Sequence, residues 1–152
     1  MRDPRDALRA WLALLNVSGA LKKRIDAHMR EHFGLSLARF DVLAALDRAG
    51  AGGLNGGALS AQLKVTEGAT TQVTTPLIAQ GLVSRAVSSA DARVAIFKLT
   101  AKGQRLFDRM AEANRGWVAQ AFCDFSPAQI EHLRALLGAI RTKPAPAEEQ
   151  PA

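Results

Sequence analysis

Two histidines and a glutamate lie within five residues of one another, in the run His28-Met29-Arg30-Glu31-His32. The order H-x-x-E-H is that of the inverted zinc-peptidase motif. On a helix, His28 and His32 share one face, where two imidazoles can bind zinc. A peptidase also needs a third ligand and a substrate cleft, and this helix is committed to packing. We therefore expect no catalytic residues, enzyme activity, cofactor or metal. Two other functional hypotheses stay open for these residues. The first is a metal-responsive regulator, and the second, less favoured, is a metal-dependent hydrolase that uses them.

A second group of polar side chains belongs to a predicted helix-turn-helix. Leu59 and Leu63 are four residues apart, which suits one face of a short helix. After the break at Lys64, Thr66 is a predicted N-cap for a second helix. The positions expected to pack inward on that helix are Thr70, Val73 and Leu77. Its opposite face is expected to carry short hydrogen-bonding groups without charge, namely Thr71, Gln72, Thr74 and Thr75, as in a helix that enters the major groove.

A β-hairpin is predicted directly after this helix. Gly81 is expected to end the helix in a left-handed conformation. Residues 82–87 and 94–99 are predicted strands, separated by the turn-forming residues 88–93. Leu54-Asn55 is a predicted third strand. A helix-turn-helix followed by such a hairpin is a winged helix.

The flanking segments are predicted to be helices. Asp3 and Pro4 start a helix that runs to Phe33, about 45 Å long. Its apolar stripe from Leu8 to Met29 is too long for one small domain to cover, so a partner must cover part of it. Ser36 and Thr100 are predicted to cap helices that end near residues 48 and 122, and Ser126 starts a last one. Residues 142–152 are predicted to form a disordered tail.

Length and charge set the broad class. The 152 residues suit one domain, and the net charge of +6 favours anionic partners. Residues 58–103 contain five basic and two acidic side chains, so the positive charge extends to the predicted winged helix. No secretory or membrane-spanning segment is evident, and we expect a cytoplasmic protein with no membrane partner. The single cysteine, Cys123, is expected to be a small buried residue.

The chain resembles the MarR family of bacterial transcriptional regulators over roughly residues 8–141. The matching features are the helix-turn-helix and Gly81-Leu82-Val83 followed by Arg85. The matching features farther along the chain are Asp91 and Arg93 in the wing, and Leu99-Thr100 with Gly103. Upstream, residues 35–43 resemble the second helix of the family. Two departures are Ala92, where many relatives have another arginine, and Pro76, which is expected to kink the recognition helix.

The resemblance implies a fold and an assembly. The fold class is mainly α with a small β-hairpin wing, a winged helix-turn-helix with N- and C-terminal dimerisation helices. Residues 1–34 and 101–141 are the expected dimerisation helices, and 35–100 the DNA-binding domain. The expected function is that of a homodimeric, ligand-responsive repressor that binds a pseudo-palindromic operator in double-stranded DNA.

The resemblance also implies roles for individual residues. The expected DNA-binding residues are Lys64, Thr70, Thr71, Gln72, Thr74, Thr75, Arg85, Asp91 and Arg93. A small aromatic or phenolic acid is the expected ligand. The residues that would line its site are Trp11, Leu15, His28 and Phe40.

Overall fold

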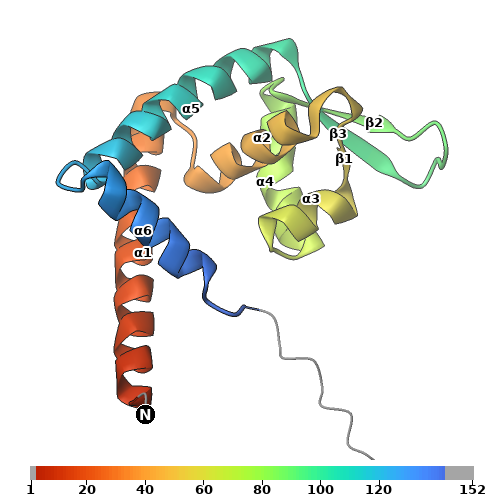
Figure 1. Ribbon diagram of the computed structural model, residues 1–152. Coiled ribbons are helices and arrows are strands. Elements are labelled where there is room, and N and C mark those ends of the chain that lie inside the picture. The colour runs from red at the N-terminus through yellow and green to blue at the C-terminus, as the bar shows by residue number, and fades with distance from the viewer. Residues whose placement is uncertain (1–2, 143–152) are drawn as a thin grey trace, which may run out of the picture. The chain divides into compact units, whose positions relative to one another are not determined.

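The computed structural model describes residues 3–142 and is mainly helical, with one small sheet (Figure 1). The helices are α1 (Pro4–Phe33), α2 (Leu37–Ala49), α3 (Gly56–Leu63), α4 (Glu67–Ala79), α5 (Ala101–Ala121) and α6 (Pro127–Gly138), with a short 3-10 turn, η1 (Gly50–Gly52). The strands are β1 (Leu54–Asn55), β2 (Val83–Val87) and β3 (Ala95–Leu99). The chain divides after Trp117 into two compact units. Among these helices, none is long and apolar enough to cross a membrane.

The ends of α1 are set by local chemistry. The Asp3 carboxylate accepts a hydrogen bond from the Arg5 N–H at 2.9 Å, and Pro4 occupies the first turn. Gly34 ends the helix at φ 68°, and its N–H donates to the Arg30 carbonyl at 3.0 Å. A left-handed backbone of this kind carries little strain only in glycine. The predicted bounds of this helix are confirmed.

A carboxylate of α1 holds the start of α2. Asp26 accepts from the Leu37 N–H at 2.9 Å and from Arg30 Nε at 2.8 Å. These bonds stabilise the charged carboxylate and lower its pKa, with Arg30 the larger cause. Ser36 caps the same helix through the Arg39 N–H, as predicted. The corner between α1 and α2 is therefore fixed by hydrogen bonds as well as by packing.

The three strands form an antiparallel sheet in the order β1-β3-β2, which confirms the predicted third strand. Phe97 in the central strand lies opposite Leu54 on one side and Arg85 on the other. The two wing strands begin one residue later than predicted. The Leu82 N–H donates to Leu77 in the end of α4, and the Val94 N–H donates to Asp91 in the wing tip. Both residues belong to turns for this reason.

One apolar core joins α2, α3, α4 and the sheet to the end of α1 and to α5. Its fully enclosed side chains include Met29, Leu43, Leu46, Leu59, Leu77 and Met110. The first half of α1 is different, because its large apolar side chains are about half exposed. They are Leu8, Trp11, Leu12, Leu15 and Val17. The predicted stripe from Leu8 to Met29 is therefore uncovered in its first half and packed into the core at Met29.

The end of α4 is tied to the start of α5. Gly81 adopts φ 71° and closes the helix with its N–H on the Ile78 carbonyl, as predicted for this glycine. The Thr100 hydroxyl donates to the Gly81 carbonyl at 2.6 Å and accepts from the Gly103 N–H at 3.0 Å. Lys102 Nζ donates to the Gln80 carbonyl at 2.9 Å. The carbonyl groups at the end of the helix are thus satisfied by residues some twenty positions later.

The second unit begins within α5 and contains α6. Ser126 and Gln129 form a reciprocal capping box around Pro127, as the sequence predicted. Cys123 is exposed, so the prediction that it is buried is wrong for the single chain. The reason is its place in the turn after α5, where the chain presents it outward. The predicted disordered tail, residues 142–152, lies outside the described residues except for Thr142.

We expect Gly103→Ala to destabilise the protein, because a Cβ at this position would collide with the backbone carbonyl of Leu82. Overpacking of this kind costs roughly 1–3 kcal/mol. Gly116→Ala on the same helix is the matched control, since its Cβ meets nothing within 4 Å. It should raise the free energy of unfolding by about 0.5–1 kcal/mol. Urea unfolding at one protein concentration tests both, and equal stability of the two variants would contradict the close packing at Gly103.

Candidate nucleic-acid interface

The helix-turn-helix is built from α3, the turn at residues 64–66 and α4. Asn55 caps α3 by accepting from the Ala58 N–H at 2.8 Å. Lys64 ends α3 at φ 55°, the one non-glycine residue at positive φ within residues 3–142. A side chain in this conformation costs roughly 1–2 kcal/mol, so the surrounding turn must hold it there. The Val65 N–H helps to hold Lys64 in this conformation by donating to the Ser60 carbonyl at 3.2 Å.

A buried pair of hydroxyl groups fixes α4 against α3. Ser60 Oγ and Thr70 Oγ1 are 2.8 Å apart, and both residues are buried. Each hydroxyl also lies within hydrogen-bond distance of a backbone carbonyl, Gly56 for Ser60 at 2.8 Å and Thr66 for Thr70 at 3.1 Å. Since a hydroxyl has a single proton, one of the two donates to its carbonyl while the other donates across the pair. Polar groups enclosed in this way are stabilising only when they are paired. Thr70 therefore positions the recognition helix, and its buried hydroxyl is already used.

The other threonines of α4 hydrogen-bond to their own helix. Thr71 donates to the Glu67 carbonyl at 3.0 Å, and Thr75 donates to the Thr71 carbonyl at 2.8 Å. Thr74 donates to the Thr70 carbonyl at 2.9 Å and is only 2% exposed. The prediction that Thr74 lies on the outer face is wrong. It is four residues from Thr70, one helical turn away, and so shares the inward face.

The outer face of α4 keeps Thr71, Gln72 and Thr75, which are exposed. Thr71 and Thr75 donate their hydroxyl protons to backbone carbonyls of α4. Each exposed side chain therefore presents a hydroxyl oxygen that can accept a hydrogen bond, next to a methyl group. Thymine methyl groups and base amino groups match such a surface, and a glutamine amide can pair with adenine. The helix continues through Pro76 to Ala79.

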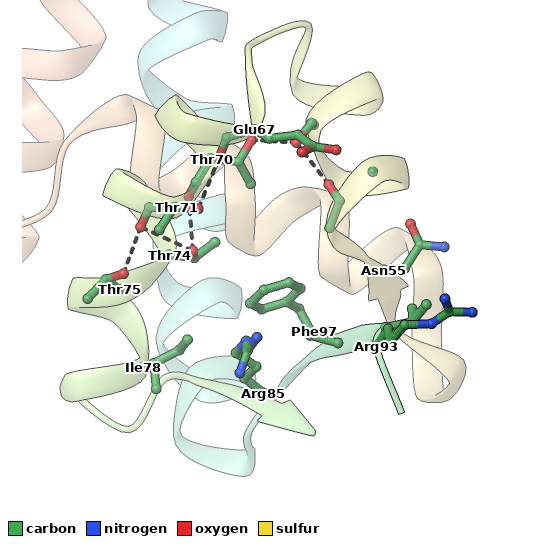
Figure 2. A pocket seen from close by; sticks show the side chains of 15 residues that line it. Asn55, Glu67, Thr70, Thr71, Thr74, Thr75, Ile78, Arg85, Arg93 and Phe97 are labelled. Carbon is green, nitrogen blue, oxygen red and sulfur yellow. Dashed lines mark hydrogen bonds between the residues drawn. The ribbon is translucent and has the colours of Figure 1, made fainter. Parts of the chain in front are cut away.

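A groove of about 620 Å³ runs between α4 and the sheet. Figure 2 shows the threonines of α4 along one wall and Phe97 in the middle. Arg85 comes from β2, and Arg93 comes from the turn before β3. The groove residues that were not predicted as site residues include Asn55, Glu67 and Phe97. Asn55 was recognisable as an N-cap before two glycines, whereas Phe97 reaches the groove only through strand pairing.

The wing tip holds its arginine by an ion pair. Arg93 donates to Asp91 from its backbone N–H at 2.9 Å and from Nε at 3.2 Å. The backbone bond is the larger cause of the lowered pKa of Asp91, and the side-chain bond adds to it. The Arg93 side chain is nevertheless 90% exposed. It is a solvent-facing cation whose direction is set by the turn.

The remaining predicted DNA contacts, Lys64 and Arg85, are exposed as well. Lys64 lies in the turn of the helix-turn-helix, and Arg85 lines the groove. Together with Arg93 they place three cations around the uncharged outer face of α4. An acidic side chain also lines the groove, since Glu67 begins α4 and lies at the edge of the groove.

The four residues predicted to bind a ligand do not form one pocket in a single chain. Trp11 and His28 are 17 positions apart on one helix, which separates them by about 25 Å. Trp11 and Leu15 are exposed, at 54% and 44%. Phe40 is buried and stacks on Phe107 with ring centroids 5.6 Å apart. The neighbour of His28 is instead Trp117, at 4.9 Å between ring centroids.

Comparison with known proteins identifies this winged helix. The family model described as MarR family matches residues 33–94. This segment is similar to the MarR family. The matched segment contains α2, the helix-turn-helix, β2 and the wing turn, so it includes both arginines of the groove but ends before β3 and Phe97. No curated protein sequence matches the chain.

Solved structures share the MarR-family fold over most of the chain. The transcriptional regulator BldR from Sulfolobus solfataricus is 24% identical, with a TM-score of 0.78 over 92% of this chain and 100% of BldR. Sco3205 from Streptomyces coelicolor, a MarR-family regulator solved in complex with DNA, is 20% identical, with a TM-score of 0.79 over 91% of this chain and 87% of Sco3205. A cysteine-to-serine mutant of Escherichia coli MarR, complexed with operator DNA, is 20% identical, with a TM-score of 0.76 over 90% of this chain and 97% of MarR. At these identities the likeness establishes the fold.

Proposed function

We propose that this protein is a DNA-binding transcriptional regulator that binds an operator as a homodimer, acts as a repressor and works in the cytoplasm. The observation that carries the proposal is the uncharged outer face of α4, held against α3 by the Ser60–Thr70 pair and surrounded by exposed cations. An uncharged polar face suits base edges, whereas the cations suit phosphates. Two structural relatives, Sco3205 and MarR, were solved with DNA. The family consists of transcriptional regulators, and we propose no enzyme activity.

Each part of the interface has a distinct proposed role. Thr71, Gln72 and Thr75 read base edges in the major groove, and buried Thr70 and Thr74 set the position of α4. Lys64 and Arg85 contact the phosphate backbone. Arg93, aimed by Asp91, reaches the flanking minor groove, where the negative potential attracts arginine. Because Ala92 precedes Arg93, the wing has no second arginine at this place.

The proposed homodimer is supported by the uncovered half of α1. Leu8, Trp11, Leu12 and Leu15 lie on one side of the helix at spacings of three and four residues. They are between 44% and 56% exposed, and a contiguous apolar stripe of this kind usually marks an interface. A second copy of the chain presents the same stripe and can cover it by two-fold symmetry. Residues 1–34 and 101–141 are the proposed dimerisation segments.

The function is tested by selecting bound sequences from a random pool of duplex DNA. We expect two inverted half-sites whose centres are about one helical turn, or 10 bp, apart. Two-fold symmetry with one recognition helix in each subunit requires this arrangement. Recovery of no enriched sequence would contradict DNA recognition, and a single asymmetric site would contradict the symmetric docking.

We expect Leu12→Glu to dissociate the dimer, because it puts a charge into the middle of the apolar stripe. Ala13→Glu is the matched control, since it places the same charge in the same turn but about 100° around the helix. Sedimentation at micromolar concentration should give a dimer for the parent chain and Ala13→Glu, and a monomer for Leu12→Glu. A monomeric parent chain with intact helical content would refute the assembly.

We expect Arg93→Ala to weaken operator binding by roughly 1–3 kcal/mol and to lower the magnitude of the salt slope by about 1. Asp91→Ala should produce a smaller loss, because it leaves the charge but removes the group that directs it. Arg48→Ala, which removes an exposed arginine of α2 that does not line the groove, is the control and should leave both quantities unchanged. Titrations at several salt concentrations measure them. If Arg93→Ala matches the control, the wing does not contact DNA.

The aromatic-acid ligand stays a prediction. Its physical support is the group around His28, where Trp117 stacks on the imidazole and Arg109 lies 5.8 Å from the centroid of the neighbouring Phe33 ring. Aromatic faces beside a cation suit an aromatic carboxylate. Benzoates and phenols should release operator DNA, and cyclohexanecarboxylate, which has the charge without the ring, should release less. A complex that survives the whole panel at millimolar concentration would remove this ligand class.

A further inference from the structure

The last turns of α1 bring together a set of metal-binding groups that the proposed DNA interface does not use. His28, Glu31 and His32 each offer one ligand atom, and these atoms all lie within 4.8 Å of one another. The spacings of three and four residues place the side chains on one helix face. We propose that these three residues bind one divalent transition-metal ion, preferably Zn²⁺.

An aromatic ring holds the two histidines in place. The indole of Trp117 stacks on His28 with centroids 4.9 Å apart and an interplanar angle of 18°. The same indole lies 5.6 Å from the His32 ring at 35°. Two imidazoles against one tryptophan lose less conformational freedom when an ion binds than two free side chains would lose. The site is therefore partly organised before the metal arrives.

One imidazole nitrogen in the cluster needs a partner. His28 Nε2 is enclosed and has no hydrogen-bond partner among the described residues. An enclosed polar atom without a partner is destabilising, and a bound metal ion would supply that partner. The remaining ligands are accessible, since Glu31 and His32 are exposed. The cluster thus combines the enclosed imidazole of His28 with a carboxylate and a second imidazole that solvent and ions can reach.

The donor set selects the class of ion. Two imidazoles and one carboxylate suit Zn²⁺ and its transition-metal neighbours, whereas Ca²⁺ and Mg²⁺ prefer oxygen ligands alone. Three protein ligands leave one position of a tetrahedral zinc site for water or another group. The proposal concerns binding, and it holds or fails independently of the proposed DNA-binding function.

Calorimetric titration of the untagged full chain with Zn²⁺ tests the site directly. We expect one ion per chain with micromolar or tighter affinity. His32→Ala and Glu31→Gln should each weaken binding by at least about 10-fold. The matched control is His132→Ala on α6, which removes the remaining histidine of the chain and should leave affinity unchanged. His32 and Glu31 are exposed, so their variants should fold even if His28→Ala does not.

A spectroscopic measurement locates the ion. In a Trp11→Phe chain, Trp117 is the remaining tryptophan, and its emission should change on Zn²⁺ addition in parallel with the calorimetric curve. Mg²⁺ at the same concentration should leave the emission unchanged. Zinc binding that persists in His32→Ala, or that is lost equally in His132→Ala, would overturn the site. So would a parent chain that binds no zinc.

Discussion

The structure depends on the close packing of Gly103 against the backbone of Leu82. At this point the recognition helix has just ended at Gly81, the wing begins at Val83, and α5 starts after Thr100. The Thr100 hydroxyl joins the three elements by donating to Gly81 and accepting from Gly103. A side chain larger than hydrogen at position 103 would force them apart. The position of α5 against the junction between α4 and β2 is therefore set by a backbone contact.

The threonines of α4 divide the recognition helix into a structural and an outward face. Thr70 and Thr74 are buried and hydrogen-bonded, whereas Thr71 and Thr75 are exposed and bonded to their own helix. An outer face without charge contributes little to the sequence-independent attraction between a protein and DNA, because that attraction comes mainly from contacts with phosphates. In the proposed complex, affinity would come from Lys64 and the two arginines of the groove. Sequence preference would come from the helix between them.

The long α1 helix has two different halves. Its first half carries an uncovered apolar stripe, and its last turns pack into the core through Met29 and carry His28 and His32 beside Trp117. The proposed dimer contact and the proposed metal site thus occupy separate stretches of one continuous helix. The Asp26 carboxylate connects the second half to α2 through the Leu37 N–H.

The sequence by itself determined the features that depend on neighbouring residues. The caps at Asp3, Thr66 and Ser126, the glycine ends at Gly34 and Gly81, and the three strands were all predictable, because caps and turns are satisfied within a few positions. The outer threonines and the wing pair Asp91–Arg93 were predictable for the same reason. Tertiary structure decided which residues became buried or met across elements. It placed Thr74 inward, exposed Cys123 and brought Trp117 against two histidines some 90 positions earlier, because the rotation and register of packed elements fix such contacts.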